Sequence, residues 1–217
     1  MKALLLKDFL VLRKQFRVLA LVFVMYGILG FFADNYIFLS AFIPFIFIML
    51  VLTSVAFDDA CKWTGYALAL PISRNQLVLS KYLLTLLLGL IGAVTSCFYG
   101  YTMLFLLKQP LSPEIFISCF TSVSIGLTSF FLLLPVVFRF GSEKARYIMF
   151  LLFMIPFLFI LIAGQSGLFD NLSLEPLKNL SSRTLLCYLL LGEAGIVILS
   201  FLISLPISIH IVEKKEY

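Results

Sequence analysis

The chain has 217 residues, of which 62% are hydrophobic and only 12% are charged, and its mean hydropathy is +1.12. Soluble domains are about half apolar and about a quarter charged, so this composition excludes a water-soluble fold. It predicts an all-α integral membrane protein, because long uncharged apolar runs are typical of spanning helices. The net charge of +5 does not indicate binding to nucleic acid. The positions of the basic residues along the chain are the informative feature.

Residues 1–17 are predicted to form an amphipathic helix at the membrane surface. One face carries apolar residues at helical spacing, and most basic residues lie away from it: Leu5, Phe9, Leu12 and Phe16 against Lys2, Arg13, Lys14 and Arg17. Such a helix lies on the inner leaflet with its basic face on anionic headgroups. The alternative is an ordinary basic flank of the first span. Either interpretation places the N-terminus in the cytoplasm.

Six apolar runs are expected to span the membrane within a single domain, residues 1–217. They cover residues 18–33, 36–57, 82–107, 114–138, 147–163 and 184–212. The N-terminal segment, the loops after the second and fourth runs, and the tail contain thirteen of the 16 Lys and Arg residues. Because basic loops stay in the cytoplasm, this distribution predicts a multi-pass protein of the plasma membrane with both termini inside the cell.

The last run, residues 184–212, is long for one span. At about 1.5 Å per residue it would measure about 44 Å, more than the roughly 30 Å of a bilayer core. Glu193 lies within it, between Gly192 and Gly195. One possibility is a tilted helix with Glu193 near the outer interface. The other, which we favour, is a re-entrant piece or helical hairpin before Glu193, followed by the true span from about Gly195.

Prolines interrupt four of the spans, at Pro44, Pro135, Pro156 and Pro206. A proline inside a helix frees a backbone carbonyl, which neighbouring helices in a bundle can satisfy. The pattern therefore fits either irregular packing or hinges of a moving bundle.

Small and hydroxyl residues are concentrated in the third and fourth spans. They permit close helix packing in lipid, which is one interpretation. The other is a weakly polar wall of a translocation path, to which an intramembrane carboxylate could also belong. The candidates for that path are Ser118, Thr121, Ser122, Thr128, Ser129 and Glu193.

Motifs for chemistry are missing from the sequence. It has no GxxxxGK[ST] for nucleotide phosphates, no HExxH for zinc and no GxSxG around a nucleophile, and its one histidine is His210. The four cysteines show no CxxC spacing and are expected to be free thiols. We therefore expect a protein that is not an enzyme and binds no cofactor or metal directly.

The loop at residues 58–81 is the longest connection on the predicted cytoplasmic side. Its notable residues are two acids, two aromatics, a proline break and a basic closure: Asp58, Asp59, Trp63, Tyr66, Pro71, Ser73, Arg74 and Lys81. We predict a short amphipathic helix, a break at Pro71, and a second helix that starts at the cap Ser73 and runs into the next span. Exposed aromatic side chains are costly in water, so they should lie on the inner leaflet or in the groove of a partner.

This loop resembles that of ABC-2-type exporter permeases. The shared pattern is a paired acid, a Trp, a Tyr three residues on, Leu-Pro-x-Ser/Thr-Arg, and Ser-Lys-Tyr at the next span, here Asp58-Asp59, Trp63, Tyr66, Leu70–Arg74 and Ser80–Tyr82. It is most similar to the short six-span subfamily, which includes the membrane subunits of the staphylococcal exporter of phenol-soluble modulins. The chain departs from the pattern at Asp59, often Glu, and at Ala60, often basic.

The resemblance implies a dimer of permeases in a bacterial plasma membrane. Each copy would bind one soluble ABC ATPase through the 58–81 loop as a coupling helix, with two ATPase copies in all and ATP-Mg held only by them. Short outer helices before the last span would form a lid, and the substrate would be an amphipathic peptide or another hydrophobic compound. The alternative function is a membrane sensor or immunity protein that binds a peptide without driven transport.

Overall fold

The computed structural model describes residues 2–32, 36–69, 73–110, 113–165 and 182–215. All regular structure within these residues is helical. The helices are α1 Lys2–Phe32, α2 Tyr36–Ala60, α3 Trp63–Ala69, α4 Arg74–Leu106, α5 Glu114–Phe140, α6 Ser142–Gln165 and α8 Ser182–Lys214.

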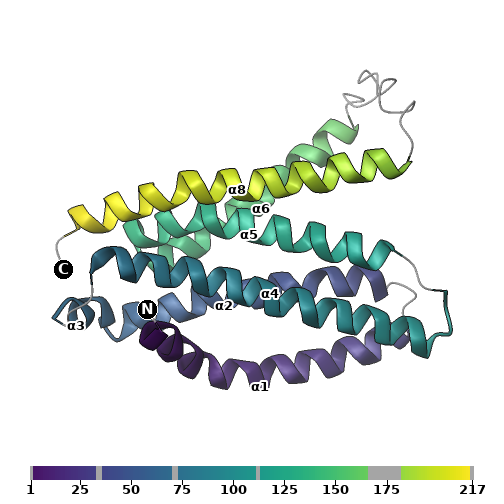
Figure 1. The fold of residues 1–217 in the computed structure, drawn as a ribbon, viewed down its shortest axis with the longest axis horizontal. Coiled ribbons are helices and arrows are strands. Elements are labelled where there is room, and N and C mark those ends of the chain that lie inside the picture. The colour runs from purple at the N-terminus through teal and green to yellow at the C-terminus, as the bar shows by residue number, and fades with distance from the viewer. Residues whose placement is uncertain (1, 33–35, 70–72, 111–112, 166–181, 216–217) are drawn as a thin grey trace.

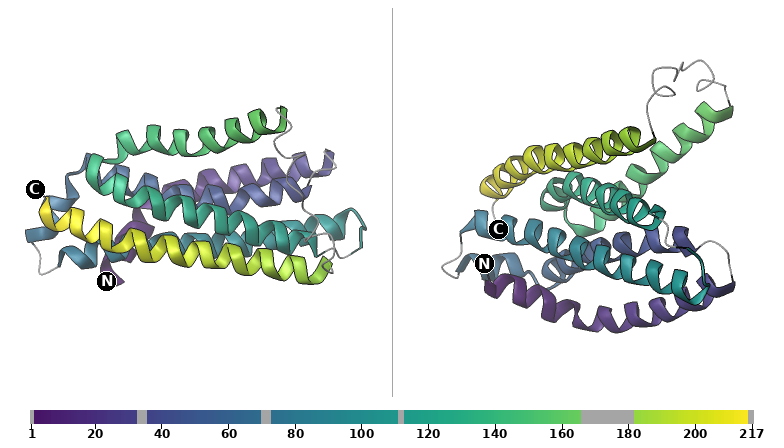
Figure 2. Two further views of the ribbon diagram at one scale, coloured as in Figure 1. Left: turned by 90° about the horizontal axis from the view of Figure 1, so that it is seen from above. Right: turned by 45° about the vertical axis from the view of Figure 1, so that its right-hand side comes forward.

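The long helices form an up-and-down bundle (Figure 1). In the described residues, α1, α2, α4, α5 and α8 are long and apolar enough to cross a membrane. Helix α2 packs against α4 and α5, and α5 packs against α8. Helix α6 begins against α5 and then diverges from the bundle along its length (Figure 2). The all-α membrane fold is therefore confirmed, and a sixth span formed by α6 stays a prediction.

Both chain ends and the short helix α3 lie at the same end of the bundle (Figure 1). This end, which we call the charged end, also contains the last turns of α2, α5 and α8 and the first turns of α1, α4 and α6. The other end, called the far end, contains the last residues of α1, α4 and α6. This arrangement places the residues of the 58–81 loop at the charged end.

The N-terminal segment and the first span are one continuous helix. We expected a surface helix over residues 1–17 followed by a short span over 18–33, but α1 runs unbroken from Lys2 to Phe32. The sequence between these two parts contains no proline or glycine that would end a helix. Leu4, Leu12 and Leu19 form its buried face, so a single stripe of side chains continues past the expected break.

Helix α8 is also continuous, from Ser182 to Lys214. The favoured prediction of a re-entrant piece ending before Glu193 is therefore wrong for these residues, and the single long helix is correct. A Cβ atom on Gly192 or Gly195 would meet nothing within 4 Å, so the two glycines mark an open helix face and not a turn. The predicted lid falls largely on residues 166–181, outside the described residues.

Hydroxyl groups from neighbouring helices satisfy the carbonyls that two prolines leave free. Pro44 has no N–H for the carbonyl of Ser40, and Ser96 of α4 donates to that oxygen over 2.7 Å. The adjacent carbonyl of Ala41 accepts from Ser122 of α5. Pro135 likewise leaves the carbonyl of Phe131 free, and Ser204 of α8 donates to it. The carbonyls at these prolines are thus part of the packing between helices.

The small residues of the third span allow close helix contact. A Cβ on Gly92 would come within 2.7 Å of the Cα of Pro44, and a Cβ on Gly100 within 2.5 Å of Ile115. A larger side chain would force the backbones apart at Gly92 and would displace the Ile115 side chain at Gly100. The close-packing interpretation is therefore correct for these two glycines.

Candidate functional site

Four charged side chains form a closed ring inside the charged end. The Lys7 ammonium lies 3.0 Å from the Asp8 carboxylate and 2.5 Å from Asp58, and Lys81 lies 2.9 Å from Asp8 and 2.6 Å from Asp58. We call these four residues, from α1, α2 and α4, the charge ring. Each cation contacts both anions, and the total charge of the ring is zero. Such pairing is what allows charges to be buried.

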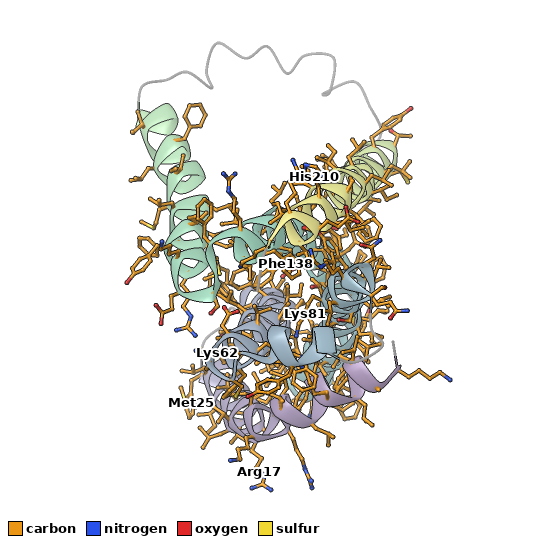
Figure 3. The ribbon with its side chains drawn as sticks, turned by 90° about the vertical axis from the view of Figure 1, so that its left-hand side faces the viewer. Arg17, Met25, Lys62, Lys81, Phe138 and His210 are labelled. Atoms are coloured by element: carbon orange, nitrogen blue, oxygen red, sulfur yellow. The ribbon has the colours of Figure 1, made fainter. Side chains whose placement is uncertain are left out.

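The charge ring is shielded from solvent and has a further polar neighbour. The Asp8 side chain is only 1% exposed and that of Lys81 9%. Ser54 of α2 donates to the Asp8 carboxylate over 3.0 Å and accepts from Lys81 over 2.9 Å. Figure 3 shows Lys81 within the bundle, whereas Arg17 of α1 points outward. Helices α1, α2 and α4 are therefore joined at this end by buried charge-assisted contacts.

Helix α3 sits directly beside the ring. It follows α2 after a tight turn in which Lys62 has a left-handed backbone with φ of 50° and its N–H donates to Asp59. The Trp63 indole lies over the Lys7 ammonium, 4.8 Å from ring centroid to Nζ. Ala67 is buried, whereas Tyr66 on the adjoining face is 68% exposed. The short helix thus has one supported face and one free face.

The start of α4 has the cap that the sequence predicts. Ser73 accepts from the N–H of Gln76, and the Gln76 side chain accepts from the N–H of Ser73, which completes a capping box. The next residue, Arg74, donates to the last carbonyls of α8, at Val212 and Glu213. Arg74 therefore joins α4 to the end of α8. Pro71 lies outside the described residues.

Asp59 joins the loop to α6. Its carboxylate accepts from the backbone N–H of Ser142, the first residue of α6, over 2.8 Å. A carboxylate at this position is favourable because the helix N-terminus carries free N–H groups and a positive dipole. Next to this contact, Lys215 donates to the carbonyl of Phe138 over 3.0 Å. The ends of α2, α5, α6 and α8 are thus connected around the base of α3.

The structure separates the eight predicted coupling residues into inner and outer positions. Asp58 and Lys81 lie in the buried ring, Asp59 and Arg74 hold neighbouring helices, and Ser73 caps α4. Asp59 and Ser73 are exposed, Trp63 is half-buried, and Tyr66 is the large aromatic side chain that is exposed among the described members. Whether these residues couple to an ATPase stays a prediction.

Sequence reasoning missed the α1 half of the ring. A usable signal was present, because Asp8 falls at helical spacing between Leu4 and Leu12 on the buried face. An acid at the centre of an apolar stripe requires a partner, and a basic residue is the expected one. Lys7 lacked any such signal, since it resembles the other basic residues of the segment.

The predicted path residues are only partly gathered. An open cavity of about 660 Å³ lies between α2, α5 and α6, and Ser118, Thr121 and Ser122 line it together with mainly Phe and Met side chains. The Ser122 hydroxyl is already bonded to Ala41, and Ser129 donates to the carbonyl of Ile125 in its own helix. Thr128 is half-buried on α5 but is not part of this lining.

Glu193 lies on α8, a helix that contributes nothing to this cavity. Its side chain is half-buried, and its Oε2 atom finds no hydrogen-bond partner among the described residues. The structure therefore does not bring Glu193 together with Ser118 and Thr121.

Long apolar helices, a buried charged network at one end and a short partly exposed helix define a multi-pass membrane protein. The family of ABC-2 family transporter proteins matches residues 3–213, and the chain belongs to this family. It is a membrane permease subunit of an ABC transporter, and the resemblance seen in the loop is confirmed at the level of the family. No curated protein and no solved structure matches the chain. The family generally works with a separate ABC ATPase and is not by itself a catalytic enzyme.

Proposed function

We propose that this permease is the membrane subunit of an ATP-driven exporter whose charged end faces the cytoplasm. A soluble ATPase binds at α3, and two ATPase copies serve a pair of permeases. ATP-Mg is held by the ATPase, and this chain contributes no cofactor site. The excess of basic residues in segments at the charged end supports this orientation.

The exposure of Tyr66 on a supported helix is the observation that carries the proposal. Helix α3 is only seven residues long, and so short a helix is not stable alone in water. Here it is attached to the bundle through Ala67 and through Trp63 above Lys7. A large aromatic side chain left free on a fixed helix is typical of a contact for a partner protein.

The cavity between α2, α5 and α6 supports the proposed substrate class. Its lining combines Phe42, Phe45 and Phe153 with the hydroxyl residues Ser118 and Thr121, and the described part of it includes no charged residue. Such a surface suits an amphipathic peptide or another hydrophobic compound. A second permease copy, the same or a related chain, would complete the path across the open side.

Co-purification with the ATPase subunit tests the proposal. Tyr66→Ala should lower the amount of ATPase retained on the permease in detergent at least fivefold. Tyr188→Ala is the matched control, since Tyr188 is equally exposed, at 67%, but lies at the far end. Equal retention by both variants, or no retention by the wild-type chain, would contradict the proposal. Peptide binding that persists without the ATPase would favour a sensor or immunity protein.

A further inference from the structure

The first turns of α1 supply half of the charge ring. Lys7 and Asp8 come from this helix, and both contact Asp58 or Lys81 of the elements that flank α3. Leu4 and Leu12 are buried on the same face of the helix, whereas Leu6 and Leu10, at about 60% exposure each, lie on its outward face. The ring is therefore the chief polar attachment of the start of α1 to the bundle, among the contacts described.

Lys7 also reaches α3. Its ammonium contacts the Asp58 carboxylate at the end of α2 and lies beneath the Trp63 indole at the start of α3. A cation over the face of an indole is an attractive arrangement, and it is stronger where water is excluded. Lys14, two turns further along α1, is exposed, so this placement is not shared by the basic residues of the helix in general.

We propose that Lys7 and Asp8 are positioning residues of the coupling site, which hold the first turns of α1 against the start of α3. A displacement of α3 by the ATPase is then transmitted to α1 as well as to α2 and α4. This inference rests on the proposed function, in which the ATPase binds at α3.

Electrostatics explains why the attachment transmits movement. Apolar contacts between helices are non-directional, so they do not by themselves fix which side chains stay paired when a helix moves. Moving α1 away from α2 and α4 would instead separate opposite charges in a poorly solvated site, where their attraction is strong. The two carboxylates and two ammonium groups therefore shift together, and α1 follows α3 through Lys7 and Trp63.

The experiment measures whether the start of α1 responds to nucleotide. A spin label is placed at Leu6→Cys in a background in which the four native cysteines are replaced by Ser. The permease is purified with its ATPase subunit in lipid nanodiscs, and the label is recorded with and without a non-hydrolysable ATP analogue. Lys7→Met and Trp63→Leu both remove the contact between α1 and α3. Lys14→Met and Trp63→Phe are the matched controls.

The expected result is a nucleotide-dependent change in the mobility of the label that falls at least fivefold in Lys7→Met and in Trp63→Leu, and Lys7→Met keeps the ATPase bound. Lys7→Arg, Lys14→Met and Trp63→Phe should keep most of the change. The inference is overturned if the wild-type label does not respond, if the response survives in both contact variants, or if Lys7→Met releases the ATPase. An ATPase that never binds the wild-type permease would instead contradict the proposed function.

Discussion

The carboxylate of Asp58 and the ammonium of Lys81 lie 2.6 Å apart and close the 58–81 loop at its base. Asp58 belongs to the last turn of α2, and Lys81 belongs to the third turn of α4. The ion pair therefore fixes the spacing of the two helices that precede and follow α3 in the chain. Residues on either side of a loop that appears polar in the sequence thus form an interior contact. The first two predictions concern this pair.

Removing one charge of the ring should destabilise the protein strongly. Lys81→Met leaves two carboxylates with one ammonium, and breaking a buried ion pair in this way costs about 3–5 kcal/mol. We expect a lower thermal unfolding midpoint in detergent for Lys81→Met. The control is Lys62→Met, which removes an exposed charge nearby and should leave the midpoint unchanged. Equal midpoints for the two variants would show that the ring contributes no stability.

Removing one charge of each sign should recover part of that loss. The double variant Lys81→Met with Asp58→Asn leaves Lys7 and Asp8 as a neutral pair. Its destabilisation should be smaller than the sum of the single variants by about 0.5–3 kcal/mol, as measured by a double-mutant cycle. Lys81→Met combined with Asp59→Asn serves as the comparison, because Asp59 contacts Ser142 and not the ring. If the losses of stability were additive in both cycles, the result would contradict an interaction between Asp58 and Lys81.

The bond from Ser204 to the carbonyl freed by Pro135 should be measurable. Ser204→Ala leaves the Phe131 oxygen without its donor and also removes a partner of the Tyr82 hydroxyl. Hydrogen bonds between helices in membranes contribute about 0.6–1.7 kcal/mol each, and a loss of about 1–2 kcal/mol is expected. Ser200→Ala, one turn earlier, removes only a bond to a carbonyl of its own helix and should cost less. The reverse order of the two losses, in unfolding measured in mixed micelles, would refute the assignment.

Enlarging two glycines in spanning helices should have different effects on the stability of the protein. Gly92→Leu introduces a side chain where a Cβ already lies 2.7 Å from the Pro44 backbone, and overpacking of this kind costs about 1–3 kcal/mol or more. Gly192→Leu places the same side chain in open space on α8 and should not destabilise. The measurement is a comparison of the expression level and the thermal unfolding midpoint of the two variants. Comparable losses would mean that small residues are needed for another reason.

Native cysteines offer a test of orientation. Cys61 is exposed in the turn before α3 at the charged end, and Cys187 is exposed near the start of α8 at the far end. On intact cells a membrane-impermeant maleimide should label Cys187 and should reach Cys61 only after permeabilisation. Cys61→Ser and Cys187→Ser identify the labelled site. Labelling of Cys61 from outside would reverse the proposed topology.

Much of the fold could be predicted because apolar run length and proline position act locally. The runs before and after the 58–81 loop became α2 and α4, and Ser73 capped the helix as its side chain chemistry requires. The unbroken α1 was not the favoured interpretation, and the unbroken α8 was the less favoured of two alternatives. The boundary in the last run was inferred from the length a bilayer permits, and that after residue 17 from the amphipathic, basic pattern of the N-terminal segment, whereas a helix continues until a residue or a contact ends it.

The site was only half predictable, because the loop pattern gives residue types but not their partners. Asp58 and Lys81 were identified as members of the loop, yet their burial depends on Asp8, 50 residues earlier in the chain than Asp58. Ser122 illustrates the same limit. As a hydroxyl in an apolar run it fitted the wall of a path, whereas its bond goes to the Ala41 carbonyl of α2, next to the carbonyl that Pro44 leaves free.

The hydroxyl bonds at Pro44 and Pro135 restrict how the bundle can move. A change of the α2 backbone at Pro44 would leave the hydroxyl groups of Ser96 and Ser122 without their acceptors. The same change of α5 at Pro135 would leave the Ser204 hydroxyl without its acceptor. We therefore expect that these two prolines are held in place by hydrogen bonds and do not act as hinges. We expect α2, α4, α5 and α8 to travel as a rigid block, with any opening of the transporter produced by displacement of α6 against it.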